Sequence, residues 1–357
     1  MKKLIAVLAS IFFMAPLVNA QEVDYTPSIS LESKFGYNRQ LQKDGLGGFG
    51  CDGFYFNLDG YISENFSYSL NQGLTSVGDV GLLDATNWLT LTYEYENFSF
   101  TAGKDAIFIG SFEYDANDLD NYFDLCSYFY NYFSAWQWGA YADWTNDAET
   151  STFAFQVASS PLASYGPEDN LFAYALAWRG YLDWYESYWT LNLMEFEKGS
   201  YVKGLAMGNN FYIGNFTMGV DFMLRGHSSD DFLNDYTLIF APSYTINDSF
   251  RLFAKCGFEM SDSTLPYDFT GEYLSNDDRI LANSENPYAI PAYLTGFEPN
   301  DPYIFYGAGI EYFPLGLDGD VRFHAVWSAN NLTNIHSLNI GVKCRFDITK
   351  SIQSLLK

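Results

Sequence analysis

Along much of the chain, apolar side chains alternate one by one with polar or small side chains. Leu89, Leu91 and Tyr93 share one phase of such a stretch, and threonine and glutamate take the other phase. A period of two is the repeat of a β-strand, whereas a helix repeats every ~3.6 residues. Stretches of about ten residues with one apolar face are typical of membrane-spanning barrels. The alternation therefore predicts an all-β fold, a transmembrane antiparallel β-barrel.

The number of alternating stretches predicts about sixteen strands. Fourteen strands remain an alternative, because the phase is unclear over 180–212. An even number brings both ends of the chain to the same side of the barrel. The predicted strands are 27–38, 53–63, 66–74, 87–95, 98–109, 132–144, 151–160, 170–180, 186–197, 201–212, 215–225, 235–245, 249–260, 302–313, 320–329 and 335–347.

Connections between these strands alternate in length. Short turns repeat an Asn-containing pattern, as in Glu64-Asn65-Phe66-Ser67 and Glu96-Asn97-Phe98-Ser99. Asn favours tight turns because it tolerates the left-handed backbone conformation. The longer connections are predicted at 39–52, 74–86, 111–131, 161–169, 226–234 and 261–300. This alternation predicts short periplasmic turns at one end and long extracellular loops at the other.

The first twenty residues have the features of a cleaved signal peptide. Lys2 and Lys3 precede an apolar run, and Val18-Asn19-Ala20 ends it as a small-x-small cleavage site. We therefore expect a signal peptide at 1–20 and an outer-membrane barrel over 21–357. Such a chain would contact outer-membrane lipid through its apolar face.

The composition argues against several classes of function. The chain has 18 Lys and Arg against 44 Asp and Glu, a net charge of −26. We expect no nucleic-acid partner, because affinity for phosphates rests largely on Lys and Arg. Only three His and no GxSxG motif occur, so we predict neither an enzyme nor a cofactor.

The four cysteines show no CxxC spacing and no His cluster, so we expect no metal site. Cys256 and Cys344 fall on the apolar phase of their strands and are interpreted as small hydrophobic residues. Cys51 and Cys126 fall in predicted loops, where a disulfide between them is one alternative.

Three segments resemble the phosphate-selective porin (O/P type) family, in its Bacteroidetes-like branch. They run from Asn87 to Asp105, from Ile109 to Asp115, and from Gln137 to Gly139. The resemblance is specific over 85–143 and extends to the mature chain in architecture. It implies a sixteen-stranded outer-membrane barrel, often a homotrimer, with loop 111–131 folded into the lumen.

Loop 111–131 carries acidic residues and no Lys or Arg. In a channel, selectivity depends on the charge and width of the constriction. If the loop enters the lumen, its acids would form that constriction; the alternative is a solvated extracellular loop. The candidates are Glu113, Asp115, Asp118, Asp120 and Asp124.

Basic residues on the inward phase of four strands are predicted to gather on one lumenal wall. A charge facing lipid at the membrane midplane would cost about 2–4 kcal/mol, which favours the inward orientation. Facing the acidic loop, this wall would set a field across the pore; the alternative is a rim position that binds headgroups. The residues are Lys34, Arg251, Lys255, Arg322, Lys343 and Arg345.

These features favour a porin, a passive diffusion channel for small hydrophilic solutes or ions. One alternative is an anion- or phosphate-selective channel that uses the basic wall. Another alternative is a structural or adhesive surface barrel that loop 261–300 plugs.

Overall fold

The structure is a computed structural model that describes most of the chain. The described residues are 25–42, 45–74, 81–122, 125–127, 130, 135–162, 170–226, 235–260, 302–331 and 334–355. The side chain of Asp118 is also not described. The predicted signal peptide at 1–20, Asp124 and loop 261–300 lie outside these residues.

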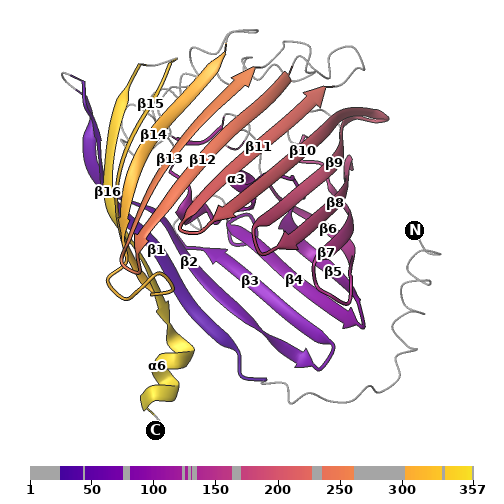
Figure 1. Ribbon diagram of the computed structural model, residues 1–357. Helices are drawn as coiled ribbons and strands as arrows, with labels where there is room; N and C mark the ends of the chain where they lie inside the picture. The colour runs from indigo at the N-terminus through magenta and orange to yellow at the C-terminus, as the bar shows by residue number, and fades with distance from the viewer. Residues whose placement is uncertain are drawn as a thin grey trace.

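Sixteen strands occur within the described residues, each antiparallel to its neighbours in sequence (Figure 1). They are β1 (Ser28–Gln40), β2 (Gly47–Ser63), β3 (Phe66–Gly73), β4 (Thr86–Tyr95), β5 (Phe98–Ala106), β6 (Trp136–Thr145), β7 (Ser151–Ser159), β8 (Phe172–Leu182), β9 (Tyr185–Glu197), β10 (Ser200–Ile213), β11 (Phe216–Gly226), β12 (Asp235–Asn247), β13 (Phe250–Met260), β14 (Tyr303–Tyr312), β15 (Val321–Asn330) and β16 (His336–Asp347). β1 also pairs with β16, which closes the barrel.

The prediction of sixteen strands is confirmed, and the alternative of fourteen is wrong. The region 180–212, where the phase was unclear, contains most of β9 and β10. The largest error is at β2, which begins at Gly47 instead of residue 53. Cys51 therefore lies in a strand and not in a loop. The disulfide alternative is wrong as well, since Cys51 and Cys126 are both free thiols.

Two-residue turns join most strand pairs at one end of the barrel, as the Asn-containing pattern predicted. Glu96 and Gly214 have φ values of 51° and 59°, so both turns use the left-handed conformation. The long-loop end has one exception. There β9 and β10 are joined by Lys198-Gly199 alone, and Gly199 has a φ of 81°.

The outward face of the barrel is apolar and exposed. Leu191 in β9 and Phe155 in β7 are 57% and 47% exposed, and similar side chains occur on most strands. An apolar face of this kind suits the hydrocarbon of a membrane. A closed barrel also satisfies its backbone hydrogen bonds between strands, as the membrane interior requires. None of the helices in the described residues is long and apolar enough to span a membrane.

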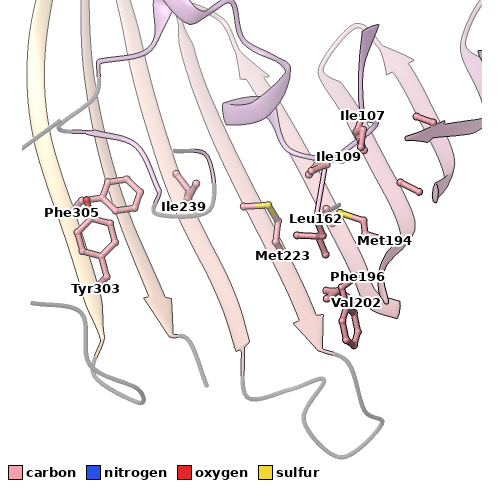
Figure 2. Close-up of a cluster of buried hydrophobic side chains, with 13 residues drawn as sticks. Ile107, Ile109, Leu162, Met194, Phe196, Val202, Met223, Ile239, Tyr303 and Phe305 are labelled. Atoms are coloured by element: carbon pink, nitrogen blue, oxygen red, sulfur yellow. The ribbon is translucent and has the colours of Figure 1, made fainter. Parts of the chain in front are cut away.

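Part of the inward face is apolar too, which the simple alternation did not predict. Figure 2 shows Ile107 and Ile109, which follow β5, near Leu162 and Met194 on the lumenal side of the strands. Buried Met223 and Phe305 belong to the same cluster. This cluster lies toward the long-loop end and fixes the chain as it leaves β5.

Helix α6 (Ile348–Leu355) follows β16 directly and was not predicted. The Thr349 hydroxyl accepts a hydrogen bond from the Ile29 amide at 2.9 Å and donates to the Pro27 carbonyl at 2.8 Å. These bonds attach the helix to the start of β1, next to the strand pair that closes the barrel.

Candidate functional site

The chain between β5 and β6 turns inward and lies against the barrel wall. We call its described residues 107–122, 125–127 and 130 the inner segment. It contains the short helix α3 (Phe112–Asp115) and the 3₁₀ turn η1 (Asp118–Asp120). Figure 1 shows α3 inside the ring of strands. Its position brings the acidic residues of the loop to the inward-facing side chains of the wall.

Asp221 of β11 holds the start of α3. Its carboxylate accepts hydrogen bonds from the Ser111 hydroxyl at 2.7 Å and from the Phe112 and Glu113 amides at 3.0 and 2.9 Å. Free amides at a helix start need acceptors, and a carboxylate supplies them. Asp221 is buried, so this anchor is shielded from water. Asp221 was not among the residues predicted from the sequence.

Glu113 is a buried structural ion rather than an open pore charge. Its carboxylate lies 2.7 Å from the Lys255 ammonium and accepts hydrogen bonds from the Ser127 amide and hydroxyl. The side chain of Glu113 is 2% exposed. A buried charge of this kind persists because it is paired and hydrogen-bonded.

Asp120 joins the inner segment to two basic residues of the wall. Its carboxylate lies 2.5 Å from Arg322 and 2.9 Å from Lys343. Arg322 also contacts Glu311 at 3.2 Å. Burial would raise the pKa of Asp120, but Arg322 and Lys343 outweigh it and hold this pKa below its usual range. Asp120 is therefore ionised at neutral pH.

Asp115 reaches the opposite wall, where it pairs with Arg179 of β8. Two hydrogen bonds of 2.5 and 3.0 Å join the guanidinium to the carboxylate. The guanidinium also stacks over the ring of Tyr188, 3.7 Å from its centroid. Arg179 was not among the predicted residues, because its contact with Asp115 depends on the path of the inner segment.

Lys34 of β1 is almost completely buried, with 1% of its side chain exposed. It lies 3.1 Å from Asp52 and donates to the Asn121 carbonyl at 3.0 Å. Its ammonium also lies 4.9 Å from the centroid of the Tyr122 ring. Burial raises the pKa of the Tyr122 phenol, so this ring stays neutral beside the ammonium.

The predicted basic wall and acidic loop thus touch, where a field across open space was expected. Arg251 pairs with Glu311 at 2.6 Å, and Lys343 also lies 3.3 Å from Glu32. Five of the six predicted basic residues therefore take part in ion pairs within the described residues. The sixth, Arg345, is exposed near the short-turn end of β16.

Between the inner segment and the opposite wall lies a cavity of about 580 Å³. It is lined on the wall side by residues of β2 to β6, β8 and β9, and on the other side by Tyr114 to Asn117. Among the described residues, three carboxylates and one guanidinium line it: Asp52, Asp105, Asp115 and Arg179. We call it the open cavity. None of the described residues form a cluster of three or more potential metal ligands.

Comparison with known proteins identifies the fold. No protein-family model matches this chain, and no curated protein matches its sequence. A loop-L8 deletion mutant of OmpT, an outer membrane protein of Vibrio cholerae, superposes with a TM-score of 0.56. It has 11% identity and covers 90% of this chain and 100% of its own.

The outer membrane channel DcaP of Acinetobacter baumannii also has a TM-score of 0.56, with 9% identity over 93% of this chain and 100% of its own. A triple mutant of the Rhodopseudomonas blastica porin has a TM-score of 0.55, with 11% identity over 90% of this chain and 100% of its own. The chain therefore has the same barrel fold as these outer-membrane proteins. These similarities concern the fold, and the resemblance to phosphate-selective porins is not confirmed.

Within this barrel, the candidate site residues that were not predicted from the sequence are mostly carboxylates on the wall. Asp105 and Asp221 lie on the inward phase of β5 and β11, whereas Asp52 is the extra residue at the register shift of β2, between Cys51 and Gly53. The phase indicates which side a residue faces, but only the path of the inner segment shows what it meets. Strand phase alone could have indicated Asp105 and Asp221, but the alternation of β2 would turn Asp52 outward with Phe54 and Phe56.

Proposed function

We propose that this barrel is an outer-membrane diffusion channel for small hydrophilic solutes and ions. The closed sixteen-strand fold and the apolar outward face support a membrane location. The residues 1–20 would then act as the signal peptide that exports the chain. The inner segment would narrow the lumen, and Asp115 at the open cavity would contribute to the constriction, whereas Glu113 is buried in its pair with Lys255.

The observation that carries the selectivity is the neutralisation of the basic wall. Lys255 and Arg322 are held by acids of the inner segment, so they present little free positive charge to a solute. More carboxylates than guanidinium groups line the open cavity. Local charge at the constriction controls ion selectivity. We therefore expect cations and neutral solutes to pass more readily than anions.

The same observation makes a phosphate channel the weaker alternative. A phosphate channel needs cationic groups that are free to replace the water around the anion. Arg251 and Lys343, which would have supplied such groups, are occupied by Glu311 and Asp120. Among the predicted wall residues, Arg345 alone is exposed without a described ion pair.

A homotrimer is the proposed assembly, because a trimer form of Vibrio cholerae OmpT is among the similar structures. That structure has a TM-score of 0.54 and 11% identity. Native mass measurement in detergent tests the proposal, and a monomeric mass would contradict it.

Single-channel recording in a planar bilayer with a KCl gradient tests the channel. Heat-modifiable migration on a gel first shows that the purified barrel is folded. We expect steady conductance steps and a reversal potential that favours K⁺. An anion-favouring potential would instead support the phosphate alternative. Folded protein without any steps would support a plugged structural or adhesive barrel.

A further inference from the structure

Aromatic rings surround the open cavity. Trp88 of β4 and Trp136 of β6 lie with their ring centroids 5.5 Å apart and both face it. Tyr55, Tyr114 and Tyr130 add three more rings to its lining. The face of an aromatic ring is electronegative and attracts a cation within about 6 Å, and Trp does so most strongly.

Asp105 adds a carboxylate to this aromatic lining. It lies on β5, between the strand that carries Trp88 and the strand that carries Trp136. It accepts hydrogen bonds from the Tyr141 hydroxyl at 3.1 Å and from the Ala106 amide at 2.7 Å. No ion pair to Asp105 exists among the described residues.

The other carboxylates of the open cavity are neutralised. Asp52 lies 3.1 Å from the Lys34 ammonium, and Asp115 forms two hydrogen bonds with Arg179. Asp105 is therefore the carboxylate in this cavity whose negative charge a cationic solute can neutralise. A cavity of about 580 Å³ is large enough for a small organic molecule.

We infer that the open cavity binds small organic cations. The ammonium group lies at Asp105, and the alkyl groups around it contact the faces of Trp88 and Trp136. This inference rests on the proposed channel and names a solute class for it. K⁺ and an alkylammonium are both attracted by the carboxylate and by the ring faces, but the alkylammonium also buries its alkyl groups against the rings.

The test uses full-length barrel in planar bilayers with choline as the probe. Its neutral carbon analogue, 3,3-dimethylbutan-1-ol, has the same shape without the charge. We expect choline to reduce the K⁺ current in a dose-dependent way, and the analogue at the same concentration to leave it unchanged. Glucose tests whether the cavity instead prefers neutral polyhydroxyl solutes.

The decisive variant is Asp105→Asn, which should weaken the choline effect about tenfold, a loss of about 1.4 kcal/mol. Asp143→Asn is the matched control. Asp143 lies on the same inward phase near the short-turn end of β6, where it accepts a hydrogen bond from Ser99. It does not line the open cavity, so this variant should keep the wild-type response to choline.

Three results would overturn the inference: equal block by the neutral analogue, stronger block by glucose, or an unchanged choline response in Asp105→Asn. Folded protein without current would contradict the proposed channel instead. In that case, titration of tryptophan fluorescence with choline decides the binding separately. A saturable change that Asp105→Asn weakens would support the inference, and no change would overturn it.

Discussion

The inner segment separates two cavities in the lumen that differ in size and in lining. On the side of β10 to β14, a cavity of about 220 Å³ is lined by ion pairs such as Glu113 with Lys255. On the other side, the cavity of about 580 Å³ has aromatic walls and one carboxylate without a described cationic partner. The first region holds the segment in place, and the second is left for solutes.

This comparison shows why a row of basic residues does not by itself make an anion path. Lys255, Arg322 and Lys343 lie on the inward face, as predicted, but an acidic segment reaches them first. Since burying an unpaired charge is costly, a packed loop with acids and a wall with bases stabilise each other. The free charge then remains on the other side of the segment.

The largest effect is expected from breaking the buried pair on the anchored side. Lys255→Met keeps most of the side-chain volume but leaves the buried Glu113 without its cation. Removing one partner of a buried pair costs about 3–5 kcal/mol. Urea unfolding of the barrel in lipid should show a loss of this order. Lys343→Met is the control, and it should cost less than about 1 kcal/mol because Arg322 still holds Asp120.

The double variant Lys255→Met with Glu113→Gln sharpens this test. It removes both charges, so most of the lost stability should return. If the double variant is as unstable as Lys255→Met alone, the cost arises from packing and not from the unpaired charge.

A smaller effect is expected at the anchor of α3. Asp221→Asn keeps one acceptor oxygen but puts an NH₂ group where the other oxygen accepted hydrogen bonds from Ser111 and Glu113. A buried hydrogen bond lost in this way costs about 1–3 kcal/mol. Hydrogen exchange at the Phe112 and Glu113 amides should accelerate. Asp143→Asn is the control, because Asp143 does not contact the inner segment. If the Phe112 and Glu113 amides also exchange faster in this control, the effect is a general loosening of the barrel.

On the open side, Arg179→Gln removes the guanidinium that faces the cavity among the described residues. The pair with Asp115 is partly exposed, so the cost in stability should stay below about 1 kcal/mol. The selectivity should change more, because Asp115 loses its counter-charge beside the permeation path. We expect the reversal potential in a KCl gradient to move further toward K⁺. An equal shift in Arg345→Gln, which lies outside the cavity, would contradict a local effect.

The strands could be predicted because alternation is a local property. Lipid contacts one face of each strand and favours apolar side chains there. Leu338 and Ile340 show the phase of β16 without any knowledge of its neighbours. The apolar lumenal cluster around Met223 was not predictable in this way, because it depends on where Ile107 and Ile109 pack. The partners of Asp120 and Asp115 depend likewise on the path of the inner segment. Sequence phase gives the side a residue faces, but not its depth or partner.

The smallest effect is expected when pH is lowered moderately on the anchored side. Arg322 and Lys343 hold the pKa of Asp120 below its ordinary value of 3.8. A lowered folded-state pKa adds stability that is present above the unfolded pKa and is lost as pH falls through the folded value. Losing this stability would loosen the inner segment in the lumen, and the channel current would become noisier. The current noise should therefore stay constant from pH 7 to about pH 5 and rise only below about pH 3.8. Asp120→Asn should be noisier at pH 7 and lack this low-pH change, and a wild-type transition near pH 6 would contradict the assignment.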